Sequence, residues 1–385
     1  MSAKKSSPFV AVRAAALLAL LASTNPVFGQ AGPAPTPAPA NGAPAPAANG
    51  ATPPAPGARR GGRGPSIPLS DADKAEIAKA DTFPAWTPGA PDGNYFVGPN
   101  YKPAPEQTPK DGVPKGKVVS FTFNEAESKF YPDTGKASWR ATRHVTVYIP
   151  SQYVPGTPAP FIVSADEYGA RGNQLPNVLD TMIAAHRVPV MIAVMIANGG
   201  GDGGGSERGL EYDTVASKNA EFIEAEILPK VEKDYGVTLT KDPDGRMSYG
   251  GSSGGSAAFT MAWFHPELYH RVLTYSGTYV NQQAGPDAPH GAWDYHATLI
   301  PQSPAKPLRV WLEAGQNDNG ATAGSSGFHN WLIANLRMAE VLKAKGYHYQ
   351  LIYAKGAGHT DGKAIAQTLP GALEWVWQDY KPVTH

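Results

Sequence analysis

Two overlapping serine motifs lie in the second half of the 385-residue chain. Both follow the pattern Gly-x-Ser-x-Gly, and their central serines are Ser252 and Ser253. The pattern is typical of a nucleophile elbow, a sharp turn from a strand into a helix that exposes one serine hydroxyl. Because the backbone at such a serine is strained, the residues two before and two after it need to be nearly free of side chains. The spacing therefore predicts a nucleophilic serine at one of these two positions.

The residues on either side of the motif fit this turn. Residues 246–249 can form a short strand, and Asp-Pro-Asp-Gly at 242–245 is a turn signal before it. Residues 257–262 then place apolar side chains at helical spacing. A flexible linker is the alternative, since Gly-Gly-Ser-Ser-Gly-Gly would suit one. The apolar helix pattern that follows at once favours the elbow.

A serine hydroxyl needs a base within hydrogen-bond reach, and the base needs an orienting carboxylate. In hydrolases with this elbow the acid and then the histidine follow the serine, each after a later strand. Asp318 lies in a loop after a predicted strand, and we expect it to be the acid, with Glu313 at the strand end as the rival. We expect His359, in a glycine-rich loop after the last predicted strand, to be the base, with His329 as the runner-up.

The developing oxyanion needs backbone donors beside the nucleophile. One is expected from the residue that follows the serine, at the start of a helix whose dipole favours negative charge. The second is expected in the loop after an earlier strand. Residues 161–164 form that strand in our interpretation, and Glu167 or Tyr168 in the next loop is the candidate donor.

The elements that must position these residues alternate between strands and helices. Two alternating segments, 118–123 and 143–149, predict an antiparallel pair at a sheet edge, and the continuous apolar runs that follow predict strands buried on both faces. The further strands are expected at 161–163, 188–196, 246–249, 272–275, 308–312 and 349–353, and the helices at 175–186, 216–235, 257–262, 331–345 and 364–380. This order predicts an α/β fold with a mainly parallel central sheet and helices on both faces.

Composition and the N-terminal segments suggest where the protein works. Lys plus Arg balance Asp plus Glu, which argues against a nucleic-acid partner, and the chain has no cysteine. The pattern of residues 1–29 predicts a cleaved signal peptide, and hence a periplasmic or extracellular protein with no membrane span after cleavage. We expect a Pro/Ala/Gly-rich disordered linker over 30–66, an irregular extension with one short helix over 67–117, and the main domain over 118–385.

At this point the chain resembles a known family. Seven pieces of sequence, in the right order, are similar to the enterochelin-esterase-like (esterase D-like) branch of the α/β-hydrolases, which also contains feruloyl and acetyl-xylan esterases. They lie at 145–150, 211–213, 242–246, 250–255, 315–318, 356–359 and 369–375. Because the family elbow reads Gly-x-Ser-x-Gly-Gly, the resemblance implies that Ser252 is the nucleophile and that Ser253 N–H is an oxyanion donor. Relatives often carry Asp-Gly where this chain has Asp166 and Glu167, so the glutamate is expected to crowd the site.

These observations predict a secreted serine esterase with Ser252, His359 and Asp318 as the triad and Ser253 and Glu167 at the oxyanion hole. No metal or cofactor is expected. The resemblance implies a small-molecule or polysaccharide-linked ester as substrate, such as a feruloyl or acetyl carbohydrate ester, or a siderophore lactone. The alternatives are an acyltransferase on the same fold and a non-catalytic binding module.

Three further residues are candidates for substrate contact. Arg208 could bind a substrate carboxylate or catecholate, or form a salt bridge with Glu211 or Asp213. Trp293 and Trp331, together with the Tyr168 already named, could line an aromatic acyl or sugar pocket, although large aromatic residues more often belong to the core.

Overall fold

The computed structural model describes residues 67–132, 142–166 and 174–381. The predicted signal peptide (1–29) and linker (30–66) lie outside the described residues, as do Glu167 and Tyr168.

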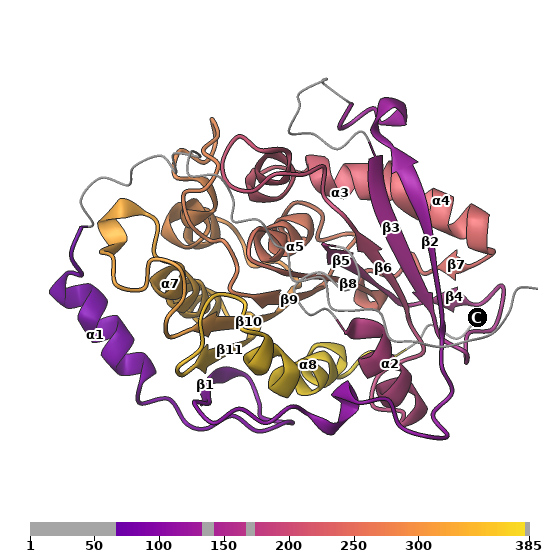
Figure 1. Cartoon of the computed structure of the whole chain (residues 1–385). Coiled ribbons are helices and arrows are strands. Elements are labelled where there is room, and N and C mark those ends of the chain that lie inside the picture. Colours follow the sequence, from indigo (N-terminus) through magenta and orange to yellow (C-terminus); the bar gives the residue numbers. More distant parts are fainter. Residues whose placement is uncertain (1–66, 133–141, 167–173, 382–385) are drawn as a thin grey trace, which may run out of the picture. The chain divides into compact units, whose positions relative to one another are not determined.

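The strands form one large sheet and one small one. In chain order they are β1 (Gly93–Val97), β2 (Lys117–Asn124), β3 (Thr142–Ile149), β4 (Pro158–Ala159), β5 (Phe161–Ala165), β6 (Ile192–Ile196), β7 (Thr238–Leu239), β8 (Arg246–Gly251), β9 (Arg271–Tyr275), β10 (Arg309–Gly315) and β11 (His348–Ala354). Within the described residues the large sheet has nine strands in the order β1-β11-β10-β9-β8-β5-β6-β3-β2 (Figure 1). The first seven strands in this order, from β1 at the edge to β6, are all parallel to their neighbours. The strand β3 is antiparallel to both β6 and β2. The predicted antiparallel pair at the sheet edge is therefore confirmed.

Helices cover both faces of this sheet (Figure 1). They are α1 (Asp71–Ala80), α2 (Leu175–Ala184), α3 (Lys218–Phe222), α4 (Leu228–Tyr235), α5 (Ser253–Phe264), α6 (Ile300–Gln302), α7 (Trp331–Ala344) and α8 (Gly362–Trp377). Residues of α3, α4, α5 and α7 share one hydrophobic cluster with one side of the sheet, and residues of α2 and α8 share a second cluster with the other side. The predicted α/β fold, with a mainly parallel sheet between two helical layers, is therefore confirmed.

The side-chain alternation of the strands explains the two clusters. In β10, Val310 and Leu312 belong to the cluster with α7, whereas Trp311 between them belongs to the cluster with α8. Successive side chains of a strand point to opposite faces, so a strand covered on both sides is apolar at every position. Burial of this kind is the main favourable term in folding.

The N-terminal extension contributes more structure than its composition indicates. The short predicted helix is present as α1, where Ser70 accepts a hydrogen bond from Asp73 N–H and Asp73 returns one to Ser70 N–H. The prediction of irregular chain is wrong at β1, which pairs in parallel with β11 at the edge of the large sheet. The sheet therefore begins before residue 118, and residues 93–97 are part of the main domain.

The carboxyl ends of the parallel strands bring the predicted site loops to one edge of the sheet. Ser252 follows β8, Asp318 follows β10 and His359 follows β11. Open parallel sheets place their functional loops at this edge.

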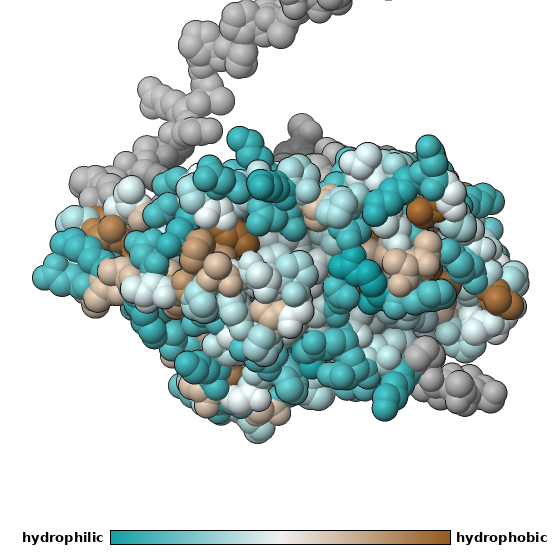
Figure 2. Space-filling view, turned by 90° about the horizontal axis from the view of Figure 1, so that it is seen from below, coloured by the Kyte–Doolittle hydropathy of each residue, from teal (hydrophilic) through white to brown (hydrophobic). Residues whose placement is uncertain are grey.

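The face of the molecule in Figure 2 is largely hydrophilic, with hydrophobic residues in small separate groups. Among the described residues, no helix has the length and hydropathy needed to cross a membrane.

Candidate active site

The predicted elbow is a strained turn between β8 and α5. Ser252 has φ of 58° and ψ of −128°, a backbone conformation that residues other than glycine rarely adopt. Two flanking glycines are required by space. A Cβ atom on Gly250 would lie 2.3 Å from Gly254 O, and one on Gly255 would lie 3.0 Å from Gly277 Cα. The small residues of the motif therefore let the helix start directly above the strand.

The structure brings Ser252, His359 and Asp318 into one chain of hydrogen bonds. His359 Nε2 lies 2.7 Å from Ser252 Oγ, and His359 Nδ1 lies 2.6 Å from Asp318 Oδ1. A proton on Nδ1 is donated to the carboxylate, which leaves the Nε2 lone pair to accept the serine proton. The Asp318 side chain is fully buried, and the His359 side chain is 19% exposed. The acid is thus shielded from water while the base and the hydroxyl remain at the surface of the site.

Backbone donors hold the Asp318 carboxylate in place. Asn319 N–H donates to Oδ1 over 2.7 Å, and Gly315 N–H donates to Oδ2 over 3.3 Å. Together with the imidazole, Oδ1 therefore accepts two N–H groups and Oδ2 accepts one. Hydrogen bonds from N–H groups stabilise the ionised form of a buried carboxylate, which has lost its hydration.

The loop that follows β9 links the serine to the histidine loop. Thr278 N–H donates to the Ser252 carbonyl over 3.0 Å. Ser276 Oγ accepts from Thr360 N–H, the residue after the base, over 2.9 Å. Ser276 and Thr360 both have positive φ angles, of 47° and 48°. Two such residues in one small region indicate that packing and hydrogen bonds fix this backbone, as is common at functional sites.

The oxyanion side of the site is built from α5 and the loop after β5. Ser253 is the first residue of α5, where helix geometry leaves N–H groups without an intrahelical carbonyl. Asp166 N–H donates to the Tyr212 hydroxyl over 3.3 Å, which engages that group elsewhere. Glu167, the predicted second donor, lies outside the described residues.

Arg208 has a different partner from either of the two predicted. Its Nη2 donates to Asp166 Oδ2 over 3.0 Å, and Asn198 Nδ2 donates to Asp166 Oδ1 over 3.0 Å. Glu211 instead receives two hydrogen bonds from buried Arg143. The prediction of a salt bridge to Glu211 or Asp213 is therefore wrong, because the residue that opens the loop after β5 takes the guanidinium.

A buried acid lies beside the residue that follows the nucleophile. Asp213 is 1% exposed, and neither carboxyl oxygen has a partner within hydrogen-bond geometry. Burial raises the pKa of Asp213 to about 7, although the neighbouring Ser253 hydroxyl and the Arg208 guanidinium both act to lower it. The sequence signalled this residue as part of the family-like piece at 211–213 and as a possible partner of Arg208, but not as a buried acid beside the nucleophile.

The rival acid and the rival base both lie outside the hydrogen-bonded chain. Glu313 is fully buried, and burial raises its pKa well above the usual range, with repulsion from Asp318 as a further cause. Both effects favour its neutral form. His329 Nδ1 lies 3.2 Å from Gly327 O, whereas the imidazole at Ser252 Oγ is that of His359. Of the two pairs of candidates, the structure joins Asp318 and His359 to the serine.

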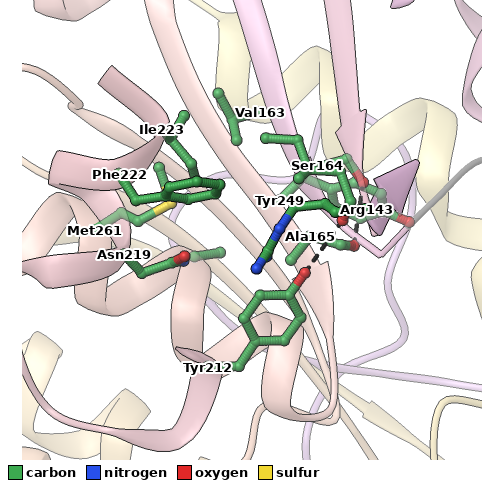
Figure 3. A pocket seen from close by; sticks show the side chains of 12 residues that line it. Arg143, Val163, Ser164, Ala165, Tyr212, Asn219, Phe222, Ile223, Tyr249 and Met261 are labelled. Carbon is green, nitrogen blue, oxygen red and sulfur yellow. Dashed lines mark hydrogen bonds between the residues drawn. The ribbon is translucent and has the colours of Figure 1, made fainter. Parts of the chain in front are cut away.

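A small cavity behind the elbow is too small for an acyl group. It has a volume of about 10 Å³ and is enclosed by residues of β5, β6, β8, α5 and α3, among them Val163, Tyr249 and Phe222. Figure 3 shows Arg143, Phe222 and Tyr212 around this space. A volume of this order is close to the minimum that admits one water molecule. The cavity is therefore a packing defect of the core.

Metal-ligand groupings and the two tryptophans can be placed as well. Across residues 67–132, 142–166 and 174–381, no group of three or more His, Asp and Glu side chains is arranged to hold a metal ion. Trp293 and Trp331 are both 4% exposed. Both belong to the hydrophobic cluster of α7, so the structure supports the core interpretation over an open aromatic pocket.

The model of the family described as "Putative esterase" matches residues 137–375, which is well over half of the chain. No curated protein matches the sequence.

Solved structures of esterases share the fold. An enterobactin esterase from Shigella flexneri is 19% identical, with a TM-score of 0.51, over 73% of this chain and 63% of that one. A ferulic acid esterase is 20% identical, with a TM-score of 0.49, over 69% of this chain and 99% of that one. The feruloyl esterase module from Clostridium thermocellum is 16% identical, with a TM-score of 0.49, over 78% of this chain and 99% of that one.

The family match and the sheet architecture agree with the resemblance that the sequence motifs indicated. This chain is a member of the esterase family of the α/β-hydrolase fold.

Proposed function

We propose that the protein is a serine esterase that cleaves carboxylic esters through an acyl-enzyme. The observation that carries the proposal is the continuous chain from Ser252 Oγ through both nitrogens of His359 to Asp318, with contacts of 2.7 Å and 2.6 Å. A serine hydroxyl is a weak nucleophile at neutral pH, and this arrangement supplies the base and the orienting acid that activate it.

The proposed reaction has two halves. In the first, Ser252 Oγ attacks the ester carbonyl carbon, His359 Nε2 takes the serine proton, and Asp318 stabilises the imidazolium. Ser253 N–H and a donor at Glu167 stabilise the oxyanion of the tetrahedral intermediate. As the intermediate collapses, the bond to the leaving oxygen breaks and His359 protonates the departing alcohol. In the second half, a water oxygen attacks the acyl carbon while His359 takes a proton from that water. The bond between the acyl carbon and Ser252 Oγ then breaks, His359 returns the proton to Oγ, and the acid product leaves.

The substrate proposed is a feruloyl or acetyl ester of a carbohydrate, or a siderophore lactone. Two observations support this substrate class. The sequence motifs resemble those of the enterochelin-esterase-like branch, and the similar solved structures include one called an enterobactin esterase and others called feruloyl esterases. We further propose that the enzyme acts outside the cytoplasm, on the strength of the signal-like pattern of residues 1–29.

A matched pair of variants tests the nucleophile. Ser252→Ala removes the proposed attacking oxygen and is expected to lower kcat for an aryl acetate on the order of 10⁴-fold or more. Ser253→Ala keeps the backbone N–H and is expected to change kcat by less than about tenfold, since only a side-chain contact with Asp213 is lost. The reverse pattern would show that the other overlapping motif supplies the nucleophile.

A further inference from the structure

Trp331, the first residue of α7, is connected to all three members of the proposed triad. The first connection leads to the serine. The indole Nε1–H donates to Thr278 Oγ1 over 3.1 Å, and Thr278 N–H donates to the Ser252 carbonyl over 3.0 Å. The indole thus anchors the residue that holds the backbone of the strained elbow.

The second connection leads to the acid. Trp331 N–H donates to the Asn319 carbonyl over 3.0 Å, and Asn319 N–H donates to Asp318 Oδ1 over 2.7 Å. This is the same carboxylate oxygen that lies 2.6 Å from His359 Nδ1. The position of the Trp331 backbone therefore sets the loop that delivers the acid.

The third connection is direct contact with the base. The rings of Trp331 and His359 have centroids 5.9 Å apart and planes inclined by 85°, an edge-to-face arrangement. Such pairs are favourable beyond the area that they bury, because the positive edge of one ring meets the negative face of the other. The contact restrains the imidazole on a side where neither the serine nor the acid holds it.

Trp331 is itself fixed from both sides. Asn335, one helical turn later, donates from Nδ2 to the Trp331 carbonyl over 2.9 Å and to the Gly277 carbonyl over 2.9 Å. Asn330 caps the helix by accepting from Ile333 N–H over 3.0 Å. With the indole buried and its nitrogen bonded, the side chain has little freedom to rearrange.

We propose that Trp331 is a positioning residue for the ester-cleaving reaction, which sets the serine, the acid and the histidine in register through three separate contacts. This inference rests on the proposed function, since it needs the triad to be the reacting group. Catalysis depends on such register because a misplacement of about 1 Å can lower the rate about 100-fold. The alternative role, lining an aromatic acyl pocket, would make Trp331 matter for some acyl groups only.

Three variants separate the two side-chain contacts, the indole bond and the ring contact, and leave the backbone bond to Asn319 in place. Trp331→Leu removes the indole bond and the ring contact, whereas Trp331→Phe keeps an aromatic ring but removes the bond to Thr278. Thr278→Val removes the acceptor of that bond and keeps the shape of the side chain. Trp86→Phe is the matched control, because Trp86 is also buried and also donates one indole bond, of 3.2 Å, to a side-chain oxygen, on Gln350.

The measurements are kcat and KM for an acetyl and a feruloyl aryl ester, with thermal unfolding of each variant. We expect Trp331→Leu to lower kcat about 100-fold for both esters with KM within about twofold. Trp331→Phe and Thr278→Val are each expected to lower kcat about tenfold. The double variant is expected to lower kcat no further, because the two substitutions remove the same hydrogen bond. Trp86→Phe is expected to lower the melting temperature and leave kcat within about twofold.

Two results would overturn the inference. One is a kcat for Trp331→Phe and Thr278→Val within twofold of the unchanged enzyme, which decides the matter even if Trp331→Leu fails to fold. The other is a loss confined to the feruloyl ester, which would assign Trp331 to the acyl pocket. Either result with an inactive Ser252→Ala leaves the proposed function standing, whereas full activity in both Ser252→Ala and Ser253→Ala would remove the proposed function itself.

Discussion

The orienting acid can be tested by an exchange that preserves shape and removes charge. In Asp318→Asn the amide has one acceptor oxygen where the carboxylate has two. In the unchanged protein, Asp318 Oδ1 accepts from His359 and Asn319, whereas Oδ2 accepts only from Gly315 over 3.3 Å. The amide oxygen therefore takes the Oδ1 position, where it keeps two of the three hydrogen bonds and the Nδ1–H tautomer of His359. The variant loses mainly the attraction between the carboxylate and the imidazolium.

The size of that loss follows from Coulomb's law. Unit charges about 4 Å apart attract by about 4 kcal/mol at an effective dielectric constant of about 20. Since the imidazolium exists in the transition state and not in the resting enzyme, this attraction lowers the barrier, and its loss slows kcat by about 10³-fold. A flipped amide, with its NH₂ group toward His359, would enforce the wrong tautomer and cost about 10⁴-fold.

Glu313→Gln is the control for this prediction. Burial raises the pKa of Glu313 well above its usual range and so favours the neutral form, which the amide resembles in charge and in shape, and kcat is expected to stay within about threefold. Both variants are measured by steady-state hydrolysis of an aryl acetate, with thermal unfolding as the check on folding. A loss below tenfold in Asp318→Asn, or a larger loss in Glu313→Gln, would refute the assignment of the acid.

Two further predictions concern stability and the elbow. Because burial raises the pKa of Asp213 to about 7 from its ordinary value of 3.8, the unfolded state releases this proton first, so the stability present below pH 4 is lost progressively up to about pH 7. Asp213→Asn is expected to remove about 3 kcal/mol of the change in stability between pH 5 and pH 8, as measured by denaturant unfolding at those two values; an unchanged dependence would contradict the buried, protonated acid. Gly250→Ala places a Cβ 2.3 Å from Gly254 O and is expected to lower kcat at least 100-fold and to destabilise the fold by about 1–3 kcal/mol, whereas Gly362→Ala, with open space around its Cβ, is the tolerated control. Equal tolerance of both alanines would show that the elbow has room to relax.

The local patterns of the sequence were sufficient to predict most of the architecture. The glycines around Ser252 predict the elbow, because only a residue without a side chain fits at Gly250, beside Gly254 O. Apolar runs announce strands covered on both faces, although β6 begins only at Ile192 and not at Val188. The reason is pairing, since its partner β5 begins at Phe161, opposite Ile192.

Other features depend on contacts between distant parts of the chain. The strand β1 is five residues long within a Pro- and Gly-rich segment, and its pairing with β11 spans more than 250 residues. Arg208 forms its salt bridge with Asp166, and not with Glu211 or Asp213, because the folded chain places the loop after β5 against the guanidinium. The contacts of Trp331 with the triad loops likewise have no signature in the sequence around it.

The most direct test of the account is the site of covalent labelling by an aryl organophosphonate. Such a reagent reacts with a serine that is activated by a neighbouring base, and peptide mass spectrometry then locates the adduct. The predicted result is one adduct on Ser252, which disappears in Ser252→Ala and is slowed in His359→Ala. An adduct on Ser253, or labelling that persists in Ser252→Ala at the original rate, would contradict the proposed chemistry.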